Sequence, residues 1–282
     1  MSTCGQSLAA LTERFKAAGI DSARLDARIL VAHALGLEPM QVFTRPEREL
    51  TPAEAEAIEA LAQRRERREP VSHILGQREF WSLSFAVTAD TLDPRPDTET
   101  LIQAVLDRIP NREAPVRLLD FGTGTGCILL TLLSELSKAK GIGVDQSVAA
   151  LDVAKANARS LGLDTRAVFM PGNWGADLHG SFDVIVSNPP YIPEAEVDGL
   201  EPEVARWEPR SALAGGADGL DCYRALIPDA ARLLAPGGIL ALEFGQGQEQ
   251  AVATILAAHG LKTEEQRSDL GGIIRCIVAK RA

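Results

Sequence analysis

The chain has 282 residues, 45% of them hydrophobic, and a formal net charge of -10 with a pI near 5.0. This length and apolar content predict a globular protein of two parts, and no apolar run reaches the roughly 18 residues that a membrane span needs. The acidic charge argues against a dedicated duplex-DNA binder, whose affinity depends on Lys and Arg contacts to phosphates. We therefore expect no stable nucleic acid complex, no membrane association and a cytoplasmic location.

Cysteine and histidine spacing indicates neither a disulfide framework nor a metal site. The cysteines are widely separated and form no C-x-x-C pair: Cys4, Cys127, Cys222 and Cys276. The histidines are scattered without metal-ligand spacing: His33, His73, His179 and His259. We expect reduced thiols in or near the core and no bound metal.

The first seventy residues predict a small helical bundle. One helix carries an apolar face made of Leu8, Leu11, Phe15 and Ala18. A second helix, capped by Asp21 and ending at Gly36, carries Leu25, Ile29 and Ala32 on its face. A third is expected to start at Thr51, because Pro52 suits the first helical position and Glu54 completes a capping box.

A basic cluster at 64–68 ends the third predicted helix. The favoured interpretation is a solvated helix end, where cations suit the negative end of the helix dipole. The alternative is contact with an acidic partner or RNA. Further on, alternating apolar residues at 79–87 predict a β-hairpin, and the prolines at 94–97 break the chain before a helix over 98–109. We expect a helical substrate-docking domain at 1–70, a hairpin linker at 71–95 and a catalytic domain at 96–282.

Strands and helices alternate after residue 115, which predicts a parallel α/β sheet with right-handed crossovers. The expected strands are 116–121, 141–145, 166–170, 182–187 and 238–244. The pattern then changes, since 261–267 and 273–278 flank Gly271-Gly272 and should pair as an antiparallel hairpin at one edge of the sheet.

A glycine-rich turn follows the first of these strands. The segment Gly122-Thr123-Gly124-Thr125-Gly126 leads directly into an apolar helix over 127–136. Glycines permit a tight turn and let a ligand approach the backbone at a helix N-terminus, although the last glycine of the dinucleotide fingerprint is missing. The next strand ends in Asp145, where a ribose-binding carboxylate is expected. The alternative is a purely structural turn with an exposed aspartate.

A rigid polar tip ends the strand at 182–187. Asn188 offers a carbonyl acceptor and two N–H donors, Pro189 offers a main-chain carbonyl, and Tyr191 offers a flat face for a planar amide or base. The two oxygen acceptors can grip a planar NH2 group. A loop in which Asn188 caps a turn and Tyr191 packs locally is the structural alternative.

The carboxyl ends of parallel strands meet at one rim, so Gly122, Asp145 and Asn188 should lie together. Asn173 and Trp174 follow the third strand and join this rim, where Trp174 could stack on an adenine; as a lone tryptophan it is more often a core residue.

Five segments, in this order, resemble the bacterial glutamine methyltransferases of peptide chain release factors. They are Arg-Glu-Phe-Trp at 78–81, Pro-Arg-Pro-Asp-Thr-Glu at 94–99, Asp-Phe-Gly-Thr-Gly-Thr-Gly at 120–126, Asn-Pro-Pro-Tyr-Ile at 188–192 and Glu-Pro-Arg-Ser-Ala-Leu at 208–213. The resemblance spans nearly the whole chain. It implies a class I S-adenosylmethionine-dependent methyltransferase fold, Rossmann-like, with a mostly parallel seven-stranded sheet, a C-terminal antiparallel hairpin and a small N-terminal helical bundle.

The resemblance also implies an activity, namely methylation of the side-chain amide of the glutamine in the Gly-Gly-Gln motif of class 1 release factors. S-adenosylmethionine is the expected cofactor and S-adenosylhomocysteine its product. The matched cofactor-binding positions are Gly122, Thr123, Gly124, Thr125, Gly126, Asp145, Trp174 and Asn188. The matched substrate positions are Asn188, Pro189, Pro190 and Tyr191, with Arg95 and Glu99 as further candidates that border the site. Among these, Asn188, Pro189 and Tyr191 are the predicted catalytic residues.

An amide nitrogen is a poor nucleophile because its lone pair is delocalised into the carbonyl. We hypothesise that the Asn188 side-chain oxygen and the Pro189 carbonyl accept both amide N–H bonds and aim the nitrogen at the sulfonium methyl, so that no strong general base is required. Three other readings stay open at this point. They are a DNA adenine methyltransferase using the same tip, a nucleotide-dependent oxidoreductase, and a non-catalytic nucleotide-binding interaction module.

Overall fold

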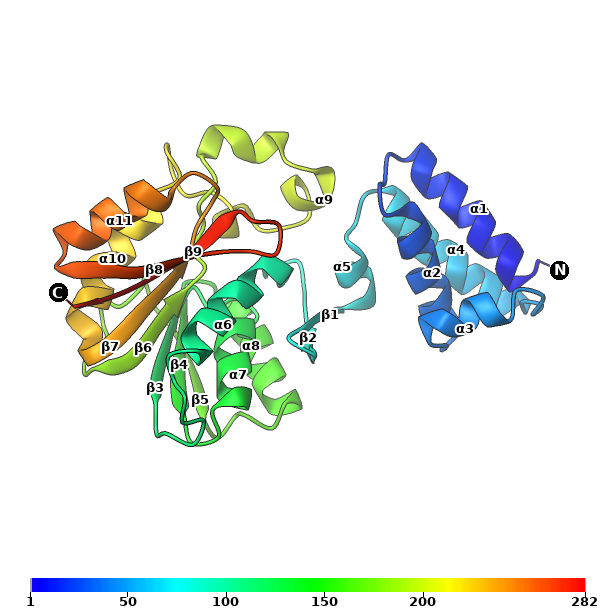
Figure 1. Cartoon of the computed structure of the whole chain (residues 1–282). Helices are drawn as coiled ribbons and strands as arrows, with labels where there is room; N and C mark the ends of the chain where they lie inside the picture. The colour runs from blue at the N-terminus through cyan, green and yellow to red at the C-terminus, as the bar shows by residue number, and fades with distance from the viewer. Residues whose placement is uncertain (1, 282) are drawn as a thin grey trace. The chain divides into compact units, whose positions relative to one another are not determined.

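The computed structural model describes residues 2–281, which form two compact units (Figure 1). One unit comprises the residues up to Gly76 together with Glu201–Trp207, and the other comprises Gln77–Leu200 and the residues from Glu208 onward. A short segment from the middle of the chain therefore belongs to the N-terminal unit. Within residues 2–281, no helix has both the length and the apolar character to cross a bilayer.

The first unit is a bundle of helices. Its elements are α1 (Cys4–Ala17), α2 (Ala23–Ala34), α3 (Pro39–Thr44), α4 (Pro52–Glu66), α5 (Val71–Leu75) and α9 (Pro202–Ala205). The predicted capping box at the start of α4 is confirmed, because Thr51 accepts a hydrogen bond from the Glu54 N–H while the Glu54 side chain accepts one from the Thr51 N–H. Leu11 and Phe15 of α1 are buried in the core of the bundle, as predicted.

The predicted apolar face of α2 is right at Ala32, which is buried, and wrong at Leu25. Leu25 is 47% exposed, and the N-cap position is Ser22 rather than Asp21. The buried face carries Ala23, Asp26, Ala27, Leu30, Val31 and the predicted Ala32. The prediction missed part of the buried face because it treated Asp26 as a surface residue. Its carboxylate is buried only because Arg65 of α4 donates a hydrogen bond to it at 2.7 Å.

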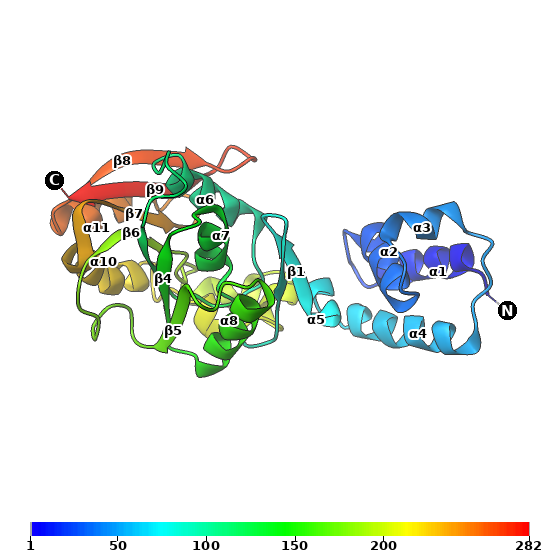
Figure 2. The same cartoon turned by 90° about the horizontal axis from the view of Figure 1, so that it is seen from below.

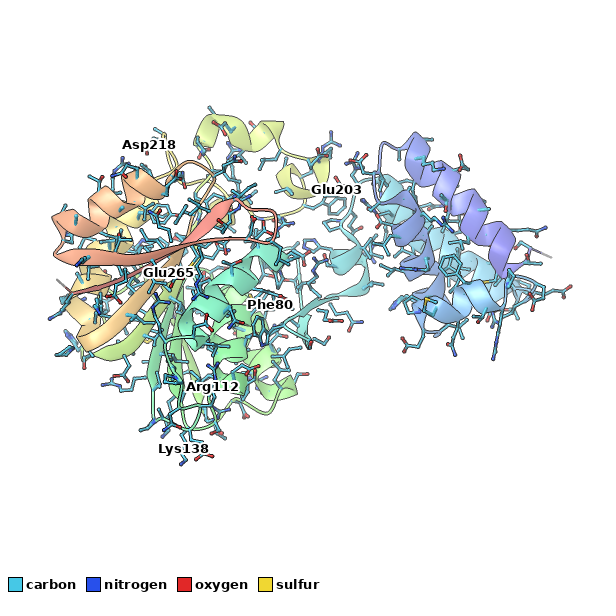
Figure 3. All side chains as sticks on the ribbon, in the orientation of Figure 1. Phe80, Arg112, Lys138, Glu203, Asp218 and Glu265 are labelled. Atoms are coloured by element: carbon cyan, nitrogen blue, oxygen red, sulfur yellow. The ribbon has the colours of Figure 1, made fainter. Side chains whose placement is uncertain are left out.

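The basic cluster at 64–68 is also not a solvated helix end. The Arg65 side chain is only 4% exposed and contacts both Asp26 and Glu203, while Arg68 binds Glu203 at 2.6 Å. Arg67 alone in this cluster fits the solvated interpretation, since it is exposed. Glu203 extends from α9 (Figure 3), so these arginines bind the segment Glu201–Trp207 to the helical unit.

The second unit contains a seven-stranded sheet in the order β5-β4-β3-β6-β7-β9-β8. The strands are β3 (Arg117–Phe121), β4 (Lys140–Asp145), β5 (Ala167–Pro171), β6 (Phe182–Ser187), β7 (Leu234–Glu243), β8 (Leu261–Ser268) and β9 (Ile274–Arg281). The first five pair in parallel, and β9 pairs antiparallel with both β7 and β8. The predicted parallel sheet with an antiparallel C-terminal hairpin at its edge is confirmed.

Helices cover both faces of this sheet (Figures 1 and 2). Because side chains alternate along a strand, Leu118 and Leu119 of β3 point to opposite faces and belong to different core clusters. One face packs against α6 (Glu99–Leu106), α7 (Cys127–Glu135) and α8 (Val148–Ser160). The other packs against α10 (Asp221–Leu233) and α11 (Glu249–Ala258).

The predicted hairpin forms from β1 (Gln77–Phe80) and β2 (Leu83–Ala86), which pair antiparallel. Its two turn residues, Trp81 and Ser82, both have positive φ, as a tight two-residue hairpin turn requires. Phe80 (Figure 3) and Phe85 are buried in the core cluster beside α6 and α7. After the hairpin, a 3-10 turn η1 (Pro96–Thr98) leads into α6, which ends three residues before the predicted end at 109.

Candidate functional site

The strand order reverses between β3 and β6. From β3 the chain adds β4 and β5 on one side and then returns to place β6 on the other, so the loops after β3 and β6 diverge and leave a crevice. Gly122 follows β3 and Asn188 follows β6 at this point. Below the crevice, the Ser187 hydroxyl donates a 2.7 Å hydrogen bond to the Phe121 carbonyl, which fixes the two strand ends together.

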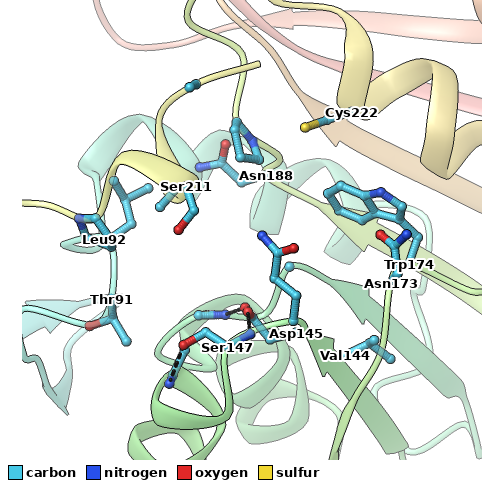
Figure 4. Close-up of a pocket in the computed structure, with 18 of the residues that line it drawn as sticks. Thr91, Leu92, Val144, Asp145, Ser147, Asn173, Trp174, Asn188, Ser211 and Cys222 are labelled. Carbon is cyan, nitrogen blue, oxygen red and sulfur yellow. Dashed lines mark hydrogen bonds between the residues drawn. The ribbon is translucent and has the colours of Figure 1, made fainter. Parts of the chain in front are cut away.

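The glycine turn after β3 requires its glycines. Gly122, Gly124 and Gly126 all have positive φ, a conformation that strains other residues. Asp145 at the end of β4 holds this turn, because its two carboxylate oxygens accept hydrogen bonds from the N–H groups of Gly124 and Ser147, each at 2.9 Å (Figure 4). Each oxygen keeps a further acceptor position, which suits a pair of ribose hydroxyls.

A cavity of about 410 Å³ lies at this rim. Figure 4 shows Asp145, Trp174 and Asn188 around it, each from a different segment. Of the predicted site residues, the structure places six in its lining: Gly122, Gly124, Asp145, Trp174, Asn188 and Pro190. Sequence reasoning missed further lining residues, among them Thr91, Leu92, Gln146, Ser147, Ser211 and Cys222. Gln146 and Ser147 carried a usable signal, since they directly follow the acid that ends β4, and Ser211 carried another, since it lies in the matched segment 208–213.

Trp174 is partly buried and has a φ of 53°, unusual for a large side chain. Its ring meets Phe121 edge-on, with centroids 6.4 Å apart. The strained backbone and the cavity position hold an aromatic surface at the rim, as a planar ligand would need. The prediction that it contacts adenine stays a prediction.

Thr123, Thr125 and Gly126 do not line the cavity but stabilise the turn from beneath. Thr123 is buried, and its hydroxyl donates a 2.6 Å hydrogen bond to Asp120. Asp120 begins the matched segment 120–126 but was not among the predicted site residues, and it is fully buried near the end of β3. Burial, with a smaller contribution from the nearby Asp145 charge, raises the pKa of Asp120 to about 7, against the effect of the Thr123 hydrogen bond.

Arg95 and Glu99 have partners inside the protein. Arg95 binds the buried carboxylate of Glu208 at 2.6 Å, which joins the segments 94–99 and 208–213. Burial raises the pKa of Glu208 to about 7 although Arg95 opposes the shift. Glu99 accepts a 3.0 Å hydrogen bond from the N–H of Trp81 in the hairpin turn. Neither residue lines the cavity, and their contact with substrate stays a prediction.

The tip after β6 is held from two sides. The Asn188 NH2 group donates to the Thr98 hydroxyl at 3.2 Å, and the Tyr191 carbonyl accepts from Gln248 at 3.0 Å. Pro189 is buried, and neither it nor Tyr191 lines the cavity. Burial, followed by the charge of Glu243, raises the pKa of Tyr191 to about 12, so this phenol stays protonated at neutral pH.

The segment 213–215 runs beside the tip and keeps it in place. Ile192 donates to the Leu213 carbonyl at 3.0 Å and accepts from the Gly215 N–H at 2.8 Å. A Cβ atom at position 215 would lie 2.7 Å from the Pro190 carbonyl oxygen and 2.9 Å from the Tyr191 Cα. Only glycine allows this close backbone approach behind the tip.

Comparison with known proteins extends over most of the chain. Residues 6–76 match the family model described as PrmC N-terminal domain, and residues 113–267 match one described as Methyltransferase domain. A release factor glutamine methyltransferase of Rhodospirillum rubrum is 54% identical over 95% of this chain and 82% of that protein. Another, from Bradyrhizobium diazoefficiens, is 47% identical over 96% of this chain and 92% of that protein.

A solved structure supports the fold alone. The crystal structure of a ribosomal protein L11 methylase from Lactobacillus delbrueckii subsp. bulgaricus has a TM-score of 0.51 and 20% identity, covering 67% of this chain and 82% of that one. The identity to the two relatives is high and covers 82% and 92% of their length. The sheet order, the glycine turn and the Asn-Pro-Pro-Tyr tip are consistent with it. The chain therefore belongs to the release factor glutamine methyltransferase family.

Proposed function

We infer that this protein transfers a methyl group from S-adenosylmethionine to the side-chain amide nitrogen of the glutamine in the Gly-Gly-Gln motif of class 1 release factors. The observation that carries this inference is the position of the Asn188 amide. It borders the same cavity as Asp145 and the glycine turn, in a chain 54% identical to a release factor glutamine methyltransferase. The residue expected to bind the substrate amide therefore lies at the same cavity as the residues expected to bind the cofactor.

The cavity fits the cofactor in size and chemistry. Its volume of about 410 Å³ lies in the range of small-molecule sites. Gly122 and Gly124 offer backbone at a helix N-terminus, Asp145 offers carboxylate oxygens for ribose hydroxyls, and Trp174 offers a flat surface for adenine. When bound, S-adenosylmethionine supplies an electrophilic methyl group on a sulfonium sulfur.

The protein's contribution to the reaction is to bind and orient the amide. The Asn188 side-chain oxygen has no hydrogen-bond partner within residues 2–281, so it can accept one amide N–H of the substrate. The carbonyl of Pro189, the next residue, would accept the other N–H from outside the cavity lining. These bonds hold the nitrogen in the orientation that attack requires, an effect that can supply roughly 7 to 11 kcal/mol.

No side chain of the tip is suited to act as a strong base. Tyr191 stays protonated, and burial raises the pKa of Cys222, which lines the cavity, to about 11. The nitrogen becomes acidic once it is methylated, so its proton can pass to water or to a backbone acceptor. The residues of the tip therefore support catalysis by positioning.

Mass spectrometry tests the activity directly. Incubation of purified protein with a release factor and isotopically labelled S-adenosylmethionine is expected to add one labelled methyl group to the Gly-Gly-Gln glutamine. Duplex DNA and free adenine nucleotides serve as parallel substrates and should stay unlabelled. Labelled DNA with unlabelled release factor would instead establish an adenine methyltransferase.

Asp145→Ala is expected to weaken cofactor binding. The substitution leaves the N–H groups of Gly124 and Ser147 without their acceptor and removes a charged partner for the ribose. A hydrogen bond to a charged group contributes about 1.5–3 kcal/mol, so the Kd for S-adenosylhomocysteine should rise about 10- to 100-fold. Calorimetric titration measures it, with Asp152→Ala as control, because Asp152 is an exposed residue of α8. An unchanged Kd would remove Asp145 from the cofactor site.

We also propose that the helical region 1–70 docks the release factor, because the catalytic tip recognises only an amide. Two large apolar side chains of α3 are exposed, Met40 at 65% and Phe43 at 36%. The guanidinium groups of Arg24 and Arg28 lie 5.8 and 5.4 Å from the Phe43 ring centre. An aromatic ring beside two cations is a surface that can bind a protein of mixed apolar and acidic character.

The double substitution Met40→Ala with Phe43→Ala is expected to raise KM for intact release factor about tenfold and to leave KM for a short Gly-Gly-Gln peptide unchanged. Steady-state kinetics with both substrates measures this. Leu270→Ala is the control, since Leu270 is an exposed apolar residue of the other unit. Equal changes in KM for protein and peptide would remove this docking role.

A further inference from the structure

The Asn188 amide is held by two buried polar residues from other segments. Its NH2 group donates to the Thr98 hydroxyl at 3.2 Å. Glu243 at the end of β7 lies beside both side chains, and Thr98 and Asn188 lower the pKa of its carboxyl group against the opposing effect of burial. The sheet register explains this contact, because Ser187 of β6 pairs with Leu242 of β7, so the next residues along the two strands are Asn188 and Glu243.

These partners fix the direction of the amide. A carboxylate can only accept hydrogen bonds, so a carboxylate beside these two side chains favours a Thr98 proton and an Asn188 N–H that point toward it. The Thr98 oxygen, having donated its proton, can only accept. Both partners therefore favour the NH2 end of Asn188 on their side, so that the carbonyl end faces the cavity. The two ends of an amide have nearly the same shape, so without these partners a reversed amide would present N–H groups to the substrate.

Burial of the Glu243 carboxylate is energetically unfavourable. Its side chain is 2% exposed, and one oxygen, Oε2, is buried without a hydrogen-bond partner among residues 2–281. A buried carboxylate with incomplete hydrogen bonding destabilises a fold, so its presence beside the tip calls for a role other than stability. The residues around it are Asp97 before α6, Arg275 and Cys276 of β9, Tyr191 after β6, and Tyr223 of α10, whose hydroxyl donates to the Glu243 main-chain carbonyl.

We propose that Thr98 and Glu243 are positioning residues that set which end of the Asn188 amide faces the substrate glutamine. This inference rests on the proposed function, because it assigns to both residues an action through Asn188 on the substrate amide. Neither residue lines the cavity.

Thr98→Val removes the hydroxyl and keeps the shape of the side chain. It should lower kcat for release factor methylation about tenfold and leave the Kd for S-adenosylhomocysteine unchanged, while Thr98→Ser should restore most of kcat. Thr131→Val is the matched control. Thr131 is equally buried in α7, and its hydroxyl has no hydrogen-bond partner within residues 2–281. Combining Thr98→Val with Asn188→Ala should be no slower than Asn188→Ala alone, because the effect passes through Asn188.

Glu243→Gln separates positioning from stability. Glutamine offers both donors and an acceptor, so it no longer dictates the direction of Asn188, and kcat should fall about tenfold. The melting temperature should rise, because a buried charge is removed. Substitution of a purely structural residue would lower kcat and the melting temperature together. Burial raises the pKa of Glu243 to about 7, so wild-type kcat should also fall as pH drops through 7, and Glu243→Gln should lack this decrease.

An independent readout uses the four asparagines of the chain, Asn111, Asn157, Asn173 and Asn188. After selective 15N-asparagine labelling, the Asn188 NH2 signals, assigned by their loss in Asn188→Ala, should shift with a midpoint near pH 7 in the wild type and not in Glu243→Gln. Wild-type kcat in both Thr98→Val and Glu243→Gln would overturn the positioning role. A wild-type protein that methylates no release factor would instead overturn the proposed function, and the NMR titration would still report on the Asn188–Glu243 contact.

Discussion

Asn188→Ala is expected to lower kcat for release factor methylation about 100- to 1,000-fold, the usual loss when one preorganised hydrogen-bonding group is removed from an active site. The Asn188 side chain lines the cavity, and the substitution removes its amide together with the hydrogen bond to Thr98. An amide nitrogen without two acceptors is free to rotate away from the reactive orientation, so the loss falls on kcat rather than on binding.

Single-turnover methylation of a release factor, followed by mass spectrometry, measures this change. The Kd for S-adenosylhomocysteine should stay within about threefold of the wild-type value, since Asp145 and Trp174, the residues predicted to bind ribose and adenine, lie on other segments of the rim. Asn111→Ala is the control, because Asn111 is exposed in the turn before β3. Turnover near the wild-type level with cofactor binding intact would exclude the positioning mechanism.

The sheet of this protein could be predicted well from sequence because its signals are local. Each buried strand is a short apolar run, and β6 begins and ends where it was predicted, at Phe182 and Ser187. The rim could be predicted for the same reason. Residues that directly follow parallel strands must gather at one edge, and Gly122, Asp145, Trp174 and Asn188 do line one cavity.

Residues contributed by loops and by distant segments could not be predicted this way. Thr91 and Leu92 follow the hairpin, and Cys222 lies at the start of α10, yet all three line the same cavity. Thr98 and Glu243 meet Asn188 only because β7 pairs beside β6 and η1 packs at their ends. The spacing of these residues in the sequence does not predict their contact, because the contact depends on the strand order of the folded sheet.

The helical unit shows a different limit of sequence-based prediction, because hydrophobic periodicity assigns every charged residue to the surface. That rule failed at Asp26 and Arg65, which are buried as a pair. It also failed to link the cluster at 64–68 with Glu203, which lies far along the chain but belongs to the same unit. The domain boundaries predicted at 70 and 95 stay predictions. The helical unit also contains the segment Glu201–Trp207, which a division of the chain into consecutive domains cannot assign to it.

Arg65→Ala is expected to destabilise the helical unit by about 3–5 kcal/mol, the usual cost of leaving a buried charge without its partner. The Asp26 side chain is 7% exposed and would lose its arginine, and Glu203 would keep only Arg68. The cavity belongs entirely to the other unit, so the Kd for S-adenosylhomocysteine should not change.

Hydrogen exchange measured by mass spectrometry can separate the two units, because it reports opening segment by segment. Faster exchange is expected in α2, α4 and α9 of Arg65→Ala, with the sheet unchanged. Arg67→Ala is the matched control, as Arg67 lies in the same cluster but is exposed. Replacing Arg65 and Asp26 together by apolar residues should recover much of the loss, because a buried ion pair is often no more stable than an apolar pair of similar volume. If Arg65→Ala and Arg67→Ala exchanged alike, the arginine would not hold Glu201–Trp207 to the bundle, and the membership of that segment in the helical unit would need another cause.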